Sequence, residues 1–359
     1  MLWILFLGFM FIGGIAAIIY LVTRFHKFSF IKNIPNKAVS WIVAVIPVLL
    51  MICVAFYDIY TMIVIMLHCA LFFILTDIGA LIYRKAKKKE PAGRYYSGVI
   101  ALVLTALAMS GAWFCAYHVF RSHYEFETPK QSGDIRIAFI ADSHLGVTLD
   151  GDRFGEQMQR IDAEGCDAFI IDGDFVDDDS SREDMETACS YLGRMKTPVY
   201  YVYGNHDRGY YDHRDFNGDD LVRCLEANGV TILQDEAELI EDRFYIVGRE
   251  DRSRDRLPIS ELTKDLDKSL YIISCDHQPC EFDEEHEAGA DLVLSGHTHG
   301  GHVWPSGYFG VWFGVNDGLW GLYTRGDTNC IVTSGISGWA IPFKTGTFSE
   351  YVIIDIHGT

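Results

Sequence analysis

Five short segments carry side chains that can bind a metal ion, and each follows a short apolar run. The segments are Asp142-Ser143-His144, Gly173-Asp174, Gly204-Asn205-His206-Asp207, His277 and Gly296-His297-Thr298-His299. The runs before them are Ile135–Ala141, Ala168–Ile171, Val199–Tyr203, Leu270–Ile273 and Leu292–Leu294. Such runs, separated by helix-length polar stretches, predict buried strands of an α/β fold, in which ligands collect beyond the carboxyl ends of the strands. We therefore expect the five segments to meet in one metal site.

The candidate ligands combine carboxylate, imidazole and amide oxygen, and they include no cysteine. They are Asp142, His144, Asp174, Asn205, His277, His297 and His299. Seven ligands are too many for one tetrahedral ion, but they suit two divalent or trivalent ions if one carboxylate bridges them. The donor set suits Mn, Fe or Zn. Two such ions roughly 3.5–4 Å apart can activate water and clamp a phosphoryl group. The pattern therefore predicts hydrolysis of a phosphate ester.

In this order the segments resemble the signature of the calcineurin-like metallophosphoesterase superfamily: Asp-x-His, Gly-Asp, Gly-Asn-His-Asp, an isolated His and Gly-His-x-His. The resemblance extends over residues 135–356 and implies a sandwich of two sheets flanked by helices, whereas periodicity alone predicts only an α/β fold. It also implies two ligand sets that share Asp174. One set is Asp142, His144, Asp174 and His299, and the other is Asp174, Asn205, His277 and His297.

The resemblance gives His206 a catalytic role, in which it stabilises the transition state or protonates the leaving oxygen. Asp207 would orient it. Asp177 stands where the purple acid phosphatase variant has a tyrosine ligand, which argues against that variant. Taken singly, His277 could be an ordinary loop histidine and Asp207 a helix N-cap. The ordered set of segments favours the metal site.

A second resemblance is to bacterial membrane-associated members of the superfamily, some of which cleave phosphodiester or pyrophosphate bonds in lipid-linked sugars. It rests on Gly296–Gly301, Ser334–Gly338 and a terminal strand at Glu350–Ile356. His302 departs from that branch, which more often has Gln there. His302 and Arg214, in the loop after His206, are our candidates for substrate contact, although a merely solvated loop would also explain Arg214.

The chain divides sharply near residue 120. Residues 1–120 contain four apolar stretches, each close to or beyond the ~20 residues that cross a bilayer as a helix. They are Leu2–Val22, Val39–Tyr57, Ile59–Tyr83 and Val99–Phe120. We therefore expect a four-helix transmembrane region at 1–120, a linker at 121–134 and a metallophosphoesterase domain at 135–359. The chain would be a multi-pass protein of the cell membrane.

The loops predict the orientation of the spans. Basic residues crowd the first–second and third–fourth connections, and the short second–third turn has only Asp58. Since basic loops stay in the cytoplasm, the catalytic domain is predicted to be extracytoplasmic. Asp77, inside the third span, is expected to pair with Arg84 or Lys85.

Charge separates along the same boundary. Residues 1–120 hold ten Lys and Arg against three acidic residues, which leaves twenty against forty-six beyond them. An acidic catalytic domain argues against nucleic-acid binding, where a basic surface normally dominates affinity. The expected partners are a phosphoester substrate, which the second resemblance extends to lipid-linked esters, and membrane lipid; the sequence points to no protein partner. An alternative function is a membrane sensor or binding module that recognises phosphate without turnover.

The six cysteines beyond residue 120 allow two interpretations. They can form three disulfides outside the cell or fill small gaps in the core. Several stand beside strand or helix patterns, which favours the core.

Overall fold

The computed structural model describes residues 2–88, 93–209 and 214–359, with side chains from residue 13 onward. Two compact units divide the chain, Met1–Gly111 and Ala112–Thr359. Residues 210–213, in the loop that contains Arg214, lie outside the described residues.

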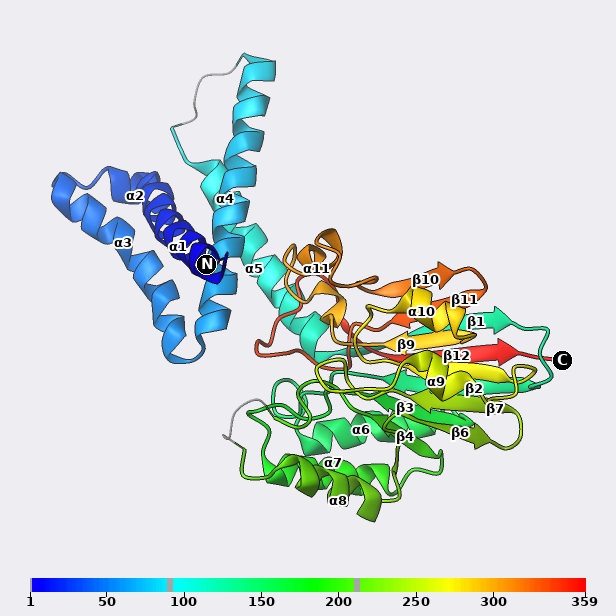
Figure 1. Ribbon diagram of the computed structural model, residues 1–359. Coiled ribbons are helices and arrows are strands. Elements are labelled where there is room, and N and C mark those ends of the chain that lie inside the picture. The colour runs from blue at the N-terminus through cyan, green and yellow to red at the C-terminus, as the bar shows by residue number, and fades with distance from the viewer. Residues whose placement is uncertain (1, 89–92, 210–213) are drawn as a thin grey trace. The chain divides into compact units, whose positions relative to one another are not determined.

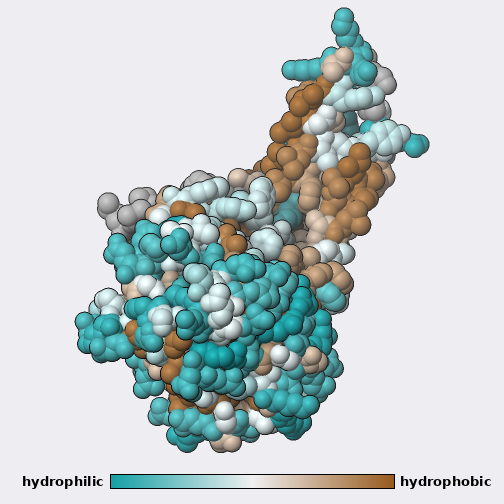
Figure 2. Space-filling model, turned by 90° about the vertical axis from the view of Figure 1, so that its right-hand side faces the viewer, coloured by the Kyte–Doolittle hydropathy of each residue, from teal (hydrophilic) through white to brown (hydrophobic). Residues whose placement is uncertain are grey.

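The first unit is helical. Its elements are α1 (Leu2–His26), α2 (Ser29–Lys32), α3 (Lys37–Cys53), the 3₁₀ turn η1 (Val54–Phe56), α4 (Ile59–Lys87) and α5 (Tyr96–Tyr117), which runs into the second unit. Hydrophobic side chains cover much of the helical surface in Figure 2, whereas the visible face of the second unit is mostly hydrophilic.

Three helical segments are long and apolar enough to cross a membrane in the part of the chain that the structure describes: Lys37–Phe56, Ile59–Lys87 and Tyr96–Tyr117. Over the described residues, the expected count of four spans is therefore corrected to three. The described apolar part of α1, Gly13–His26, is shorter than the ~20 residues that a span needs.

The second unit contains two six-stranded mixed sheets (Figure 1). The first has the order β1-β12-β2-β3-β4-β5 and the second β10-β11-β9-β8-β7-β6. The strands of the first sheet are β1 (Val119–Glu127), β12 (Ser349–His357), β2 (Asp134–Ile140), β3 (Ala168–Asp172), β4 (Val199–Val202) and β5 (Thr231–Ile232). Those of the second are β10 (Gly321–Arg325), β11 (Thr328–Val332), β9 (Leu292–Ser295), β8 (Tyr271–Cys275), β7 (Phe244–Gly248) and β6 (Glu236–Ile240). Strands β2 to β5 run parallel, as do β7, β8, β9 and β11.

Helices cover the outer faces, and the inner faces pack on each other. In Figure 1, α6 (Gly151–Asp162), α7 (Arg182–Leu192) and α8 (Gly218–Ala227) lie along the first sheet. The second sheet carries α9 (Ile259–Thr263) and α10 (Phe282–Glu287), and η2 (His299–Gly301) and α11 (Tyr308–Trp312) follow β9. Alternation along β2 explains the layers, because Ile137 and Phe139 pack between the sheets while Ala138 and Ile140 face α6 and α7.

The predicted linker at 121–134 is wrong over its first half, because Val119–Glu127 forms strand β1. This strand pairs in parallel with all of β12, from Val119 opposite Ser349 to Glu127 opposite His357. Its residues alternate between more and less buried along the strand. Such alternation is typical of a half-buried edge strand, and Pro129 and Gly133 follow only after it ends.

All nine cysteines are free thiols, and Cys189, Cys275 and Cys330 are buried. The interpretation as core residues therefore describes these three better than a disulfide framework does.

Candidate metal centre

The five predicted ligand segments converge at the carboxyl ends of β2, β3, β4, β8 and β9. Each begins within a few residues of the end of its strand. Among the described residues, three groups of His and Asp side chains bring their ligand atoms within 4.8 Å of one another. The groups are Asp142 with His144 and His299, Asp174 with His277 and His297, and His144 with Asp177 and His206.

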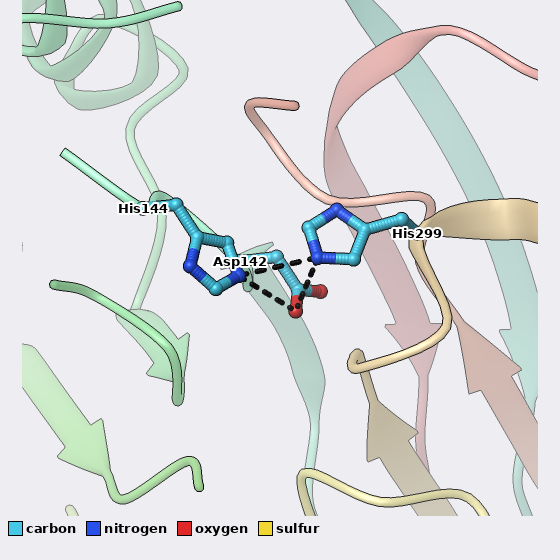
Figure 3. A group of neighbouring side chains, drawn as sticks. All are labelled: Asp142, His144 and His299. Atoms are coloured by element: carbon cyan, nitrogen blue, oxygen red, sulfur yellow. Dashed lines mark hydrogen bonds and ion pairs between the residues drawn. The ribbon is translucent and has the colours of Figure 1, made fainter. Parts of the chain in front are cut away.

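The first group joins the ends of β2 and β9 (Figure 3). The Nε2 atoms of His144 and His299 lie 3.2 Å apart, and Oδ1 of Asp142 lies 3.4 Å from Nε2 of His299. Two ligands on one ion, each about 2.0–2.1 Å from it, are separated by roughly this distance. All three side chains are buried, so the group is already assembled.

The second group joins the ends of β3, β8 and β9. Oδ2 of Asp174 lies 3.1 Å from Nε2 of His277, whose Nδ1 lies 2.7 Å from the carbonyl oxygen of Asp172. That contact is a hydrogen bond donated by Nδ1, which leaves Nε2 as the ligand atom. The buried Oδ1 of Asn205 has no hydrogen-bond partner among the described residues, as expected of an oxygen kept for a metal.

Strained backbone is concentrated at these ligands. Among the described non-glycine residues, positive φ values occur at five of the seven predicted ligands. They are Asp142, His144, Asp174, His297 and His299, with φ from 36° to 66°. Each such residue costs about 1–3 kcal/mol, and such strain clusters at functional sites.

Two glycines let the strand ends approach closely. Gly173 has a φ of 79°, and a Cβ there would lie 2.6 Å from the backbone of Gly204 and 2.7 Å from Nδ1 of His277. A Cβ on Gly204 would lie 2.3 Å from Oδ1 of Asp174. Glycine is therefore required at both positions if Asp174 and His277 are to meet.

Asp207 has contacts that its predicted role does not include. Its buried carboxylate accepts backbone N–H groups from Asp174, Phe175, Val176 and Gly204 at 2.7–3.2 Å. These bonds tie the loop after β4 to the loop after β3, so Asp207 fixes the position of Asp174. We predicted instead that it orients His206.

Among the described residues, Asp177 places a carboxylate oxygen 3.0 Å from Nδ1 of His206. Its other oxygen lies 3.0 Å from Nδ1 of His144. Sequence reasoning used Asp177 only to argue against a tyrosine ligand. The spacing Gly-Asp-x-x-Asp was the available signal, because it returns a second carboxylate to the same strand end.

The electrostatics of the site favour a bound cation. Burial raises the pKa of Asp142 to about 6, whereas for Asp174 burial is outweighed by His277, His144 and His206, which hold its pKa below the usual range. Burial lowers the pKa of His297 to about 4, and burial and His144 hold the pKa of His299 well below its usual value. Neutral imidazole is the form that binds metal.

His277 is different, because Asp174 and Asp142 outweigh its burial and raise its pKa well above the ordinary value. The buried carboxylates therefore attract positive charge, and a metal ion would supply it. Oδ1 of Asn205 is buried without a described hydrogen-bond partner, and the ligand atoms are separated as they would be around an ion. The predicted ligands therefore fit metal binding.

The two candidates for substrate contact lie beside the centre. His302 is 9% exposed, and its ring centroid is 5.4 Å from that of His299. Nη1 of Arg214 donates to the carbonyl oxygen of Asp207 at 3.1 Å. Their predicted contact with substrate stays a prediction.

Comparison with known proteins identifies the same segment. The family model described as calcineurin-like phosphoesterase matches residues 135–301. A transmembrane protein with metallophosphoesterase domain from Danio rerio is 28% identical over 77% of this chain and 67% of its own length. An uncharacterized metallophosphoesterase of Campylobacter jejuni is 28% identical over 65% of this chain and 62% of its own. An uncharacterized metallophosphoesterase of Aquifex aeolicus is 29% identical over 66% of this chain and 90% of its own length.

The matched segment includes all the predicted ligands and their strands, from β2 to η2. The chain spans about two thirds of the length of the Danio rerio and Campylobacter jejuni relatives. The match, the similar proteins and the assembled ligand groups together identify residues 135–301 as a domain of the calcineurin-like phosphoesterase family.

Proposed function

We propose that this chain hydrolyses phosphoric ester bonds with a centre of two metal ions, and that it prefers diesters at the membrane surface. One observation carries the proposal. Oδ2 of Asp174 lies 3.1 Å from Nε2 of His277 and 3.6 Å from Nε2 of His144, so one carboxylate oxygen reaches both ligand groups. Two ligand sets that share a carboxylate are typical of two-metal hydrolases.

The metal ions would activate water and neutralise charge on the phosphoryl oxygens. Asp142, His144 and His299 would hold one, His277, His297 and Asn205 would hold the other, and Asp174 would contact both. The ions would be Mn, Fe or Zn, which suit these donors.

His206 supplies the proton for the leaving group. Asp177 holds its ring through Nδ1, so proton transfer to substrate falls to Nε2. Burial lowers the pKa of His206, but Asp177 and Asp174 outweigh burial and raise it. The protonated form is therefore available near neutral pH, as a general acid requires.

Aromatic side chains beside the centre support a substrate with an apolar part. The ring of Trp339, 44% exposed, lies 5.7 Å from that of His206. Further exposed aromatics follow η2, at Trp304, Tyr308, Phe309, Trp312 and Phe313. A Cβ on Gly307 would lie 2.0 Å from Cα of Gly301, so this segment packs closely on the loop of His299. A lipid-linked phosphodiester or pyrophosphate matches a metal centre with an apolar wall.

The spans would keep this acidic domain at the membrane, on the extracytoplasmic side. The basic residues of the 24–37 and 84–94 connections support this orientation by the positive-inside rule. Digestion of residues 121–359 by protease added to intact cells would agree with it. Protection of those residues until the membrane is broken would contradict it.

Hydrolysis of bis(p-nitrophenyl) phosphate and of p-nitrophenyl phosphate by the full-length protein with Mn²⁺ tests the proposed activity. We expect faster turnover of the diester and its loss in Asp174→Asn. Asp179→Asn is the matched control, because Asp179 is exposed and outside the ligand groups. No turnover of either ester, with metals bound, would favour the alternative of a sensor that recognises phosphate without hydrolysis.

A further inference from the structure

A pocket of about 1050 Å³ lies within the helical unit, and none of the predicted metal ligands is among its described lining residues. The ends of α1 and α4, the residues around α2 and the beginning of α5 line it. Five of the lining residues that the structure describes are basic: Arg24, Lys27, Lys32, Arg84 and Arg94. Asp77 is the one acidic residue among the described residues that line it. The described part of the wall therefore carries an excess of four positive charges.

Asp77 organises this wall rather than neutralising it. Its carboxylate accepts hydrogen bonds from Nη1 of Arg24 at 2.8 Å and from Nζ of Lys27 at 3.2 Å. It also accepts hydrogen bonds from the hydroxyl groups of Tyr95 at 3.0 Å and Ser97 at 2.8 Å. These bonds join the ends of α1 and α4 to the beginning of α5. The expected pairing of Asp77 with Arg84 or Lys85 is thus replaced by pairing with Arg24 and Lys27, which come from the other basic connection.

The remaining basic residues of the wall are left for a ligand. Lys32, Arg84 and Arg94 have no ion pair or hydrogen bond from their side chains to the residues that the structure describes. Three cations from two connections that face one cavity repel one another, and an anion would relieve that repulsion. Guanidinium groups in particular match the oxygens of a phosphate.

The rest of the lining suits a phosphate attached to an apolar chain. Hydroxyl and amide groups of Ser29, Asn33 and Tyr96 add hydrogen-bond capacity. Leu81 and Ile100, which are 45% and 52% exposed, continue the wall onto helices apolar enough to span a membrane. Basic pockets between membrane helices bind the headgroups of acidic lipids.

We propose that this pocket binds a phosphate-bearing anion, the headgroup of an acidic phospholipid, or a free phosphate compound with the same chemistry. This site differs from the metal centre in residues and in unit, so it does not depend on the proposed hydrolysis. Lipid bound here would sit between the basic ends of α1, α4 and α5.

Native mass spectrometry of the detergent-purified full-length protein can measure this binding. The probes are dioctanoyl phosphatidylglycerol, dioctanoyl phosphatidylcholine and inorganic phosphate. Each titration is repeated on Asp174→Asn, in which phosphate binding at the metal centre is expected to be lost. We expect phosphatidylglycerol to bind at least tenfold more tightly than phosphatidylcholine, and this preference to persist in Asp174→Asn.

The pocket variant is Arg84→Gln/Arg94→Gln, and its control is Lys85→Gln/Lys87→Gln. The control removes the same charge from exposed residues of the same connection that do not line the pocket. We expect the pocket variant to weaken phosphatidylglycerol binding at least tenfold and the control less than twofold. Equal weakening by both, or equal affinity for the two lipids with no phosphate binding, would overturn the proposal. Competition by inorganic phosphate would identify a free phosphate compound as the ligand, and its absence would identify the lipid headgroup.

Discussion

Nδ1 of His206 lies 3.0 Å from Oδ1 of Asp177. The other oxygen of the same carboxylate lies 3.0 Å from Nδ1 of His144. One side chain therefore holds both the predicted general acid and a predicted metal ligand. This relationship makes the roles of the two histidines separable by experiment.

Asp177→Asn should lower kcat about 10–100-fold, because residues that orient a metal ligand or catalytic ring have effects of that size. It should also move the alkaline limb of the pH–kcat profile to lower pH. Asp177 raises the pKa of His206, so its loss lets the ring deprotonate at a lower pH, and the protonated ring is the proposed active form. Asp179→Asn serves as the control. A lower kcat in Asp177→Asn without a shift of the alkaline limb would mean that Asp177 has only a structural role.

His206→Ala should reduce kcat about 10²–10⁴-fold with metal content unchanged, as expected when a general acid is removed. The loss should be smaller for p-nitrophenyl esters than for alkyl diesters, because nitrophenolate needs less help from a proton. Metal content can be checked by elemental analysis of the purified variant. Equal losses on both classes of ester would argue against proton donation by His206.

The strand ends were predictable, whereas some partners of the ligands were not. The runs before Asp142 and Asp174 are short and strongly apolar, so β2 and β3 were found within about two residues of their true ends. The ligand groups of the metal centre could be predicted from these strand ends, because parallel strands bring their carboxyl ends to one edge of the sheet.

Pairing between distant segments was harder to predict. Strand β1 was missed because its pairing with β12 joins residues more than two hundred positions apart, and an edge strand has few apolar residues. The role of Asp177 depends on where two imidazole rings point, which local pattern does not specify. Asp207 was assigned by resemblance, while its hydrogen bonds to the loop after β3 became visible only in three dimensions.

Arg249→Met should destabilise the catalytic unit by about 3–5 kcal/mol, the typical cost of leaving buried charges unpaired. Arg249 is almost fully buried and contacts Asp276 at 2.7 Å and Glu281 and Glu285 at 2.9 Å. Denaturant unfolding would measure the loss. Arg243→Met is the control, because its pair with Asp167 is partly exposed and should contribute about 1 kcal/mol or less. Similar costs for the two variants would contradict the prediction.

Glu285→Gln should flatten the dependence of stability on pH between about 4.5 and 7. Burial raises the pKa of Glu285 to about 7, so the folded state keeps a proton that the unfolded chain releases near pH 4.5. The folded state then binds more protons, and the free energy of unfolding falls as pH rises through this window, by roughly 3 kcal/mol at most. Unfolding at pH 5 and pH 7.5 tests this. An unchanged difference in the variant would exclude Glu285 as its source.

Removal of metal by a chelator should abolish hydrolysis and lower the stability of the catalytic unit. An ion present at about 100 times its Kd stabilises the folded state by about 2.7 kcal/mol, a shift of several degrees in Tm. Thermal unfolding before and after chelation, followed by readdition of Mn²⁺, measures both effects. Asp174→Asn should show no such shift, and a shift of the same size in that variant would place the responsible ion elsewhere.

The pairing of β1 with β12 also decides where the protein can be cut. A soluble fragment that begins at residue 135 would lose β1 and expose the backbone donors and acceptors along β12, from Ser349 to His357. Long unpaired edges of this kind recruit strands from other molecules. The last two turns of α5 add to this, since the carbonyl oxygens of Ala112 and Ala116 accept hydrogen bonds from the backbone N–H of Lys344 and the hydroxyl of Ser349. The end of a predicted membrane span is thus part of the catalytic unit, and recombinant truncations that omit it should aggregate.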